Sequence, residues 1–131
     1  MKKDIHIPKV EDVFVAVVQE QHPEYKTDDW NAYIINNKDV NLDTVLIASK
    51  GYSEEKITPV MRHTIKLLPA RSYAKIEFMQ EEVLKLNNEF KVTFFLENQL
   101  FDKTYKFRKN TINDKALRTL PLMQLKGVMA E

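Results

Sequence analysis

The chain of 131 residues is long enough for one domain with its own core, and its 44% hydrophobic and 30% charged residues are ordinary for a folded globular protein. The net charge of +1 supplies no global field that would attract nucleic acid or an anionic membrane. The absence of cysteine excludes disulfides, thiolate nucleophiles and sulfur-rich zinc sites, and two glycines are too few for phosphate-binding loops.

The first ten residues predict an irregular start to the domain. Two lysines follow the initial methionine, but no apolar run and no small-residue cleavage site of a signal peptide come after them. No stretch approaches the roughly 20 apolar residues of a membrane span. We therefore expect a cytoplasmic protein without a membrane partner.

The first half of the chain predicts four strands separated by turn signals. The first of them is apolar on both faces, which indicates a strand in the middle of a sandwich. Asn36–Asp39 favours a tight turn, and Gly51 is expected to adopt a left-handed turn conformation. The predicted strands cover residues 13–20, 30–35, 42–49 and 60–68.

The second half begins with Ser72–Met79, whose alternation places Ile76 and Phe78 on one face and Glu77 on the other. Residues 80–86 have a helical composition and predict a short crossover. Two cleanly alternating ribbons follow, joined as a hairpin near residues 98–99. Their predicted core side chains are Phe90, Val92, Phe94, Leu96, Phe101, Tyr105 and Phe107.

The tail, residues 111–131, is less regular. Asn113 is suited to cap a short helix that runs through Leu120 and stops before Pro121. The sequence leaves open whether the Leu- and Met-rich end packs on its own domain or on another chain.

Together these elements predict an all-β fold, an antiparallel immunoglobulin-like β-sandwich of about seven strands with a short helical crossover and a C-terminal tail. The gaps between most strands are too short for the helices of a parallel α/β fold. We expect residues 1–131 to form a single domain.

Two segments carry a resemblance to known proteins. Residues 30–37 followed by 42–47, and the turn at 67–72, resemble immunoglobulin-like domains of bacterial proteins, without the cysteine pair of antibody domains. The whole chain, including Ser49–Tyr52 and Leu86–Phe90, is similar to a family of short uncharacterised bacterial proteins. Some of these carry a label of phenylalanyl-tRNA synthetase subunit, which four arginines in 131 residues do not support, because an aminoacylating core needs paired arginines on a large sheet. The resemblance implies a fold and a bacterial setting, with no known activity.

The residues that carry catalytic chemistry do not form a recognisable motif. The histidines His6, His22 and His63 lack metal-ligand spacing, and we expect His63 to pack at a sheet edge with its ring hydrogen-bonded. The adjacent carboxylate pairs fall in loop-like stretches, and no serine has a nucleophile elbow. We expect no enzyme activity, no metal and no cofactor. The carboxylate pairs are Asp28–Asp29, Glu54–Glu55 and Glu81–Glu82.

Binding is the remaining function. The ribbon Lys103–Lys109 combines cations and aromatics, as single-strand nucleic-acid binders do, but Tyr105 and Phe107 alternate with Lys106 and Arg108 and are better explained as core. Nucleic-acid or translation-associated binding through this ribbon is the alternative hypothesis. The favoured one is a protein-interaction or accessory module, a monomer or homodimer, that binds another protein through loops or an open sheet edge. The candidate contact residues are Lys50, Tyr52, Arg62, His63 and Trp30.

Overall fold

The computed structural model describes residues 8–131, in which antiparallel strands dominate and helices are short. The expected irregular start overlaps residues 1–7, which lie outside the described residues, as does His6. A helical turn, α1 (Glu81–Leu84), joins two strands, and a 3-10 helix covers Asp114–Ala116. The strands are β1 (Val13–Gln21), β2 (Asp28–Asn36), β3 (Leu42–Tyr52), β4 (Met61–Leu68), β5 (Ser72–Met79), β6 (Asn87–Leu96), β7 (Gln99–Phe107), β8 (Arg118–Thr119) and β9 (Lys126–Met129).

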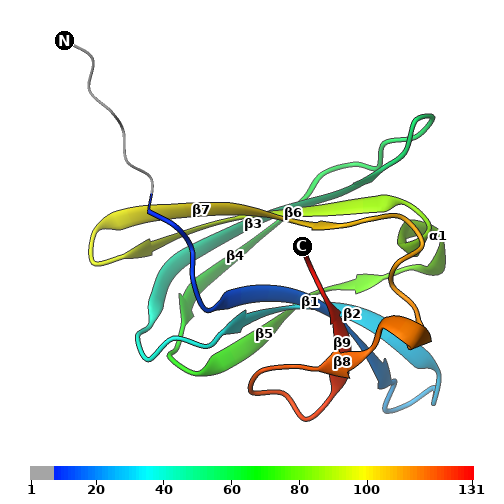
Figure 1. Ribbon diagram of the computed structural model, residues 1–131, viewed down its shortest axis with the longest axis horizontal. Coiled ribbons are helices and arrows are strands. Elements are labelled where there is room, and N and C mark those ends of the chain that lie inside the picture. The colour runs from blue at the N-terminus through cyan, green and yellow to red at the C-terminus, as the bar shows by residue number, and fades with distance from the viewer. Residues whose placement is uncertain (1–7) are drawn as a thin grey trace.

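The strands form two antiparallel sheets that lie over each other as two layers (Figure 1). Sheet A has the order β5-β2-β1-β9-β8, and sheet B has the order β4-β3-β6-β7. In β1, Val15 and Val17 face the core between the sheets, whereas Ala16 and Val18 belong to a second cluster on the outer side of sheet A. This two-sided burial explains why the first strand is apolar on both faces, as predicted.

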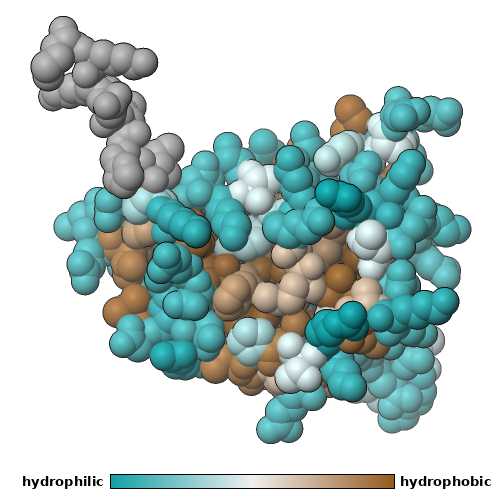
Figure 2. All heavy atoms as spheres, in the orientation of Figure 1, coloured by the Kyte–Doolittle hydropathy of each residue, from teal (hydrophilic) through white to brown (hydrophobic). Residues whose placement is uncertain are grey.

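The core lies between the layers, where the alternating ribbons direct their apolar side chains. Phe90, Val92 and Phe94 of β6 are buried, as are Tyr105 and Phe107 of β7, while Leu96 and Phe101 near the hairpin end are half-buried. Burial of one such large apolar side chain stabilises the fold by about 1.5–3 kcal/mol. Figure 2 shows hydrophobic atoms gathered between the two layers, with hydrophilic atoms above and below them.

A buried hydrogen bond ties the two sheets together. The hydroxyl of Tyr105 in β7 donates to the backbone carbonyl of Val13 in β1. Burial of the phenol raises the pKa of Tyr105 far above its ordinary value, because the charged phenolate would lose its hydration. The tyrosine therefore remains a hydrogen-bond donor at physiological pH.

The C-terminal tail packs on its own domain. β9 pairs with β1 on one side and with β8 on the other, and Val128 is buried in the main core. The last residue crosses to the other sheet, where the amide of Glu131 donates to the carbonyl oxygen of Lys106 at 2.9 Å. Between β8 and β9, Leu120 and Met123 cover the outer cluster of sheet A.

Two local expectations need correction. Gly51 lies within β3 and does not have a positive φ, because the strand continues to Tyr52 before the chain turns. Asn113 does cap a helix, and its side-chain oxygen accepts a hydrogen bond from the amide of Lys115. That helix ends at Ala116 instead of Leu120, because residues 118–119 pair with β9. None of the helices in residues 8–131 is long and apolar enough to cross a membrane.

Gly127 of β9 gives the first testable prediction. A Cβ atom there would lie 2.8 Å from the backbone oxygen of Val17 and 2.8 Å from the Cδ1 atom of Leu120. Because the backbone cannot move without disturbing β1, we expect Gly127→Ala to lower the free energy of unfolding by about 1–3 kcal/mol, measured by urea denaturation.

Gly51→Ala is the matched control for this substitution. The nearest contacts of its added Cβ are longer, 3.2 Å to Leu86 Cδ1 and 3.3 Å to Asn88 Oδ1, and both belong to side chains. A smaller loss of stability is therefore expected at Gly51. Wild-type stability of the Gly127→Ala variant would contradict the close packing of β9 on β1.

Candidate functional site

A β-bulge in β5 decides which side chains face the interior near the β4 edge. Ala32 of β2 pairs with Glu77, and Tyr33 pairs with Lys75, so Ile76 is an extra residue in the ladder. A bulge shifts the alternation of side chains by one residue. Glu77 therefore points inward on the same face as Ala32, and Phe78 is 52% exposed. The expectation from the sequence that Ile76 and Phe78 share one face is wrong for this reason, since Ile76 is buried and Phe78 is not.

Glu77 connects the two sheets through one carboxylate oxygen. The hydroxyl of Ser49 in β3 donates to Glu77 Oε1 at 2.6 Å, and His63 Nε2 in β4 lies 2.8 Å from the same oxygen. The side chain of Glu77 is 14% exposed, and that of His63 is 25% exposed. The prediction that His63 lies at a sheet edge with its ring hydrogen-bonded is confirmed.

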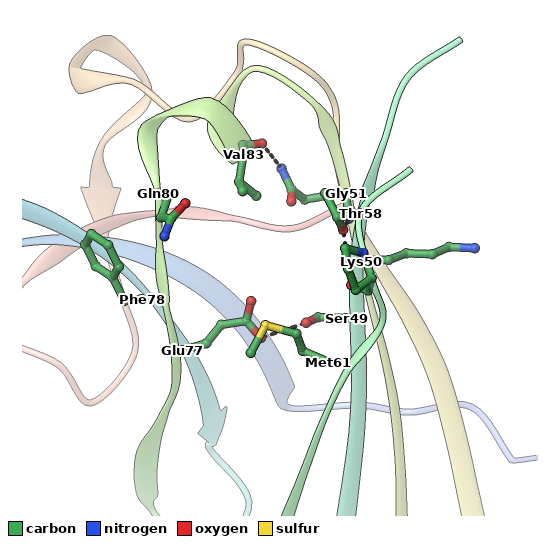
Figure 3. Close-up of a pocket in the computed structure, with 11 residues that line it drawn as sticks. Ser49, Lys50, Gly51, Thr58, Met61, Glu77, Phe78, Gln80 and Val83 are labelled. Atoms are coloured by element: carbon green, nitrogen blue, oxygen red, sulfur yellow. Dashed lines mark hydrogen bonds between the residues drawn. The ribbon is translucent and has the colours of Figure 1, made fainter. Parts of the chain in front are cut away.

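A cavity of about 380 Å³ opens beside this cluster, between the edges of the two sheets and below α1 (Figure 3). Sheet B contributes the end of β3 and the start of β4, and the other wall comes from the end of β5 and from α1. The lining combines apolar and polar side chains. It consists of Ser49, Lys50, Gly51, Thr58, Pro59, Met61, Glu77, Phe78, Gln80, Val83 and Asn88.

The second carboxylate oxygen of Glu77 faces the cavity. Figure 3 shows one oxygen of the carboxylate turned toward Ser49 and the other turned away from it, toward the space under Gln80 and Val83. Within the described residues, Glu77 Oε2 accepts no hydrogen bond, and it is not among the atoms closed off from solvent. The cavity thus has an acceptor that is available to a ligand.

The order of the three polar groups does not match a serine hydrolase. In a catalytic triad the histidine lies between serine and carboxylate and takes the proton of the serine hydroxyl. Here the carboxylate lies between the other two groups, and Ser49 is only 4% exposed. The arrangement therefore has no activated nucleophile of the triad type.

β4 borders the cavity and is paired on one side only, with β3. Hydrogen bonds at the end of β3 fix the direction of its backbone groups. The amide of Thr58 donates to the carbonyl oxygen of Gly51 at 2.9 Å, and the amide of Ser53 donates to that of Lys56 at 2.7 Å. Odd-numbered residues of β3 therefore direct their backbone N–H and C=O groups toward the side on which the β3–β4 loop and β4 lie. Because these directions alternate along antiparallel strands, the residues of β4 opposite them direct their own backbone groups toward β3.

This alternation assigns the backbone groups of β4 to its two sides. His63 is opposite Ile47 and Ile65 is opposite Val45, so these residues form the hydrogen-bonded pairs with β3. The N–H and C=O groups of Arg62, Thr64 and Lys66 then face the open edge. The side chains of these three residues are exposed.

The other sheet edges differ in how well they suit pairing with a new strand. β7 is also paired on one side only, and Glu131 occupies just the end of its outer edge, where it exchanges backbone hydrogen bonds with Lys106. β8 has two residues, and the bulge at Ile76 interrupts β5. Bulged and short edges are poor templates for strand addition. Among the described strands, β4 and β7 thus have long open stretches with regular pairing, and β4 is the one that borders the cavity.

The structure brings three of the sequence-predicted contact residues together around β3 and β4. Arg62 and His63 are neighbours in β4, and Lys50 lies in β3 with its ammonium group 3.8 Å from Glu89 Oε2. The Lys50 side chain lines the rim and points away from the cavity (Figure 3). The sequence offered no signal for the inward orientation of Glu77.

The remaining two candidates lie at different places. Tyr52 is half-buried at the end of β3, with its ring 5.9 Å from the Lys50 ammonium. Trp30 of β2 is half-buried, packs against the main core and is not part of the cavity lining. In the other predicted ribbon, the Lys103 ammonium lies 4.8 Å above the Tyr105 ring, and Arg108 Nε is 3.2 Å from Glu131 Oε2.

No cluster of three or more metal-ligating side chains was found within residues 8–131. Comparisons with protein-family models, with curated proteins and with solved structures found no significant match.

Proposed function

We propose that this protein is a non-catalytic interaction module with an immunoglobulin-like β-sandwich architecture, which binds an extended segment of another protein along β4. The carrying observation is the open edge of β4, with the backbone groups of Arg62, Thr64 and Lys66 directed outward. A partner strand would gain a ladder of backbone hydrogen bonds there, as in other cases of strand addition.

Positive charge at this edge favours an acidic partner segment. The exposed side chains of Arg62 and Lys66 lie on β4 itself, and Lys91 lies in the same cross-strand row as Arg62, with Ala48 between them. Within the described residues, none of these three cations has an ion pair. They favour a segment with Asp or Glu at every second position, and they oppose pairing with a second copy of β4, which carries the same charges.

Exposed apolar side chains around the edge support the same proposal. Met61 and Leu67, near the two ends of β4, are 52% and 47% exposed, and Phe78 across the cavity is equally accessible. Ile57 is 72% exposed on the β3–β4 loop, which projects beyond the layers (Figure 1). These side chains would pack against apolar residues that alternate with the acidic ones.

Nucleic-acid binding through Lys103–Lys109 has weaker support. Base stacking needs exposed aromatic rings, but Tyr105 and Phe107 are buried in the core. Arg108 is paired with Glu131, which reduces the charge that the ribbon offers to phosphates.

Thr64→Pro tests the proposal directly. Proline removes an N–H group that faces the open edge and makes no bond to β3, so the fold should tolerate it. Peptides would first be selected for binding to the wild-type protein from a library of random extended segments. We expect selected peptides to carry alternating acidic residues and to bind the Thr64→Pro variant at least about tenfold more weakly, a loss of about 1.4 kcal/mol.

Thr104→Pro is the matched control, because Thr104 is an exposed residue of β7 whose backbone faces away from β6 by the same alternation. This variant should bind the selected peptides with wild-type affinity. If both proline variants bind equally well, or if Thr104→Pro alone loses binding, strand addition at β4 is wrong.

A further inference from the structure

We infer that the cavity beside Glu77 is a subsite for a cationic side chain, lysine or arginine, of the segment that adds to β4. The inference rests on the proposed function for its partner, while the cavity itself is lined by Ser49 and Glu77, with His63 bound to the same carboxylate oxygen as Ser49. It adds one requirement to the partner strand. Its acidic residues lie on the outer face, and one residue on its inner face, which is turned toward the cavity, must be basic.

The acceptor in the cavity is a carboxylate oxygen that no protein donor binds within the described residues. Ser49 and His63 both bind Oε1, so Oε2 has no partner within the described residues. A carboxylate with a mostly buried side chain is stabilised by a donor at each oxygen, and a charged donor makes the stronger bond. An ammonium or guanidinium group therefore fits this acceptor better than a neutral or anionic group does.

The walls of the cavity suit the stem of such a side chain. Met61, Phe78 and Val83 contribute apolar surface to its lining. Lysine and arginine bury their methylene stems on apolar surface while the charged head reaches a polar group. The volume of about 380 Å³ is within the range of pockets that hold small ligands.

Lys50 does not fill this role for the protein itself. Its ammonium group is 3.8 Å from Glu89 Oε2 on the outer side of sheet B, and its side chain points away from the cavity (Figure 3). Gln80 and Asn88 supply neutral amide groups to the lining, and Asn88 already donates to the carbonyl oxygens of Val83 and Leu86. Glu77 thus remains the charged acceptor of the cavity.

The position of the cavity matches a strand that adds to β4. His63 and Met61 direct their side chains to the inner side of β4, and Met61 lines the cavity. A residue on the inner face of an added strand would lie beside them, because side chains on one face of paired strands are neighbours. This residue is the one that we expect to be basic.

Small probes test the subsite without a peptide. n-Butylammonium would be titrated into the wild-type protein, with butyrate as the probe of opposite charge, and the amide resonances of Ser49 and Gly51 would be followed by NMR. We expect saturable shifts with butylammonium only. The Glu77→Gln variant keeps an acceptor for Ser49 and should bind butylammonium about ten- to a hundredfold more weakly. Equal shifts with butyrate, or no shifts with butylammonium, would overturn the inference.

A second arm separates the subsite from strand addition. In a selected peptide, each basic residue would be replaced in turn by norleucine, and one replacement should weaken binding to the wild-type protein but not to Glu77→Gln. If peptides bind and no replacement has this effect, the subsite is wrong and strand addition stands. If butylammonium binds while Thr64→Pro leaves peptide binding unchanged, the amine site stands and strand addition fails.

Discussion

Replacing Phe94 with alanine is expected to lower the free energy of unfolding by about 3–5 kcal/mol. Phe94 is fully buried in β6, and its ring stacks on Phe101 of β7 with the ring centroids 5.1 Å apart. The substitution would leave a cavity between the two sheets where the surrounding strands cannot close in. Urea denaturation, followed by circular dichroism, measures the loss.

Phe95→Ala is the matched control, since it removes the same atoms at the next position of the same strand. Phe95 is 38% exposed on the opposite face of sheet B. Its loss should be below about 1 kcal/mol, as for most exposed positions. Equal losses at the two positions would contradict the alternation on which the fold is built.

Val128→Asp is expected to prevent stable folding. Val128 is 8% exposed in β9, where it belongs to the main core and pairs with Val17 of β1. An unpaired carboxylate at this place costs about 4 kcal/mol or more, a large part of the total stability of a domain. Loss of the cooperative unfolding transition in circular dichroism is the expected result.

Lys126→Asp is the matched control. It tests whether the loss of folding comes from the buried position of residue 128 or from an added aspartate anywhere in β9. Lys126 lies in the same strand but is exposed, so the same side chain there should leave the unfolding transition nearly unchanged. If Val128→Asp is as stable as the wild-type protein, the tail does not dock on β1 and the described sheet A is wrong.

The strands could be predicted because burial imposes a period of two on the sequence. The ribbon around Phe90 and Phe94 has one face in the core, and its polar residues mark the other. β9 gave no comparable signal, because four residues are too few for a recognisable pattern and its pairing partner β1 is distant in the sequence. The tail could therefore not be assigned to its own domain before the structure was known.

The candidate site could not be predicted from the alternation of apolar and polar residues. Glu77 would point to solvent in a regular strand, and only the extra residue Ile76 turns it inward. Its contacts with Ser49 and His63 join three strands that are separated by 14 to 28 positions in the chain. The hydrogen-bonded state of His63 was predictable from its place in a polar edge strand, but its partner was not.

Amide hydrogen exchange along β4 tests the central claim most directly. In the free protein, the amides of Arg62, Thr64 and Lys66 should exchange quickly, whereas those of His63 and Ile65 should be protected by their bonds to β3. A selected peptide should slow exchange at the first three positions. Protection of these three amides before any peptide is added, or fast exchange with the peptide bound, would contradict the open edge and its use by a partner strand.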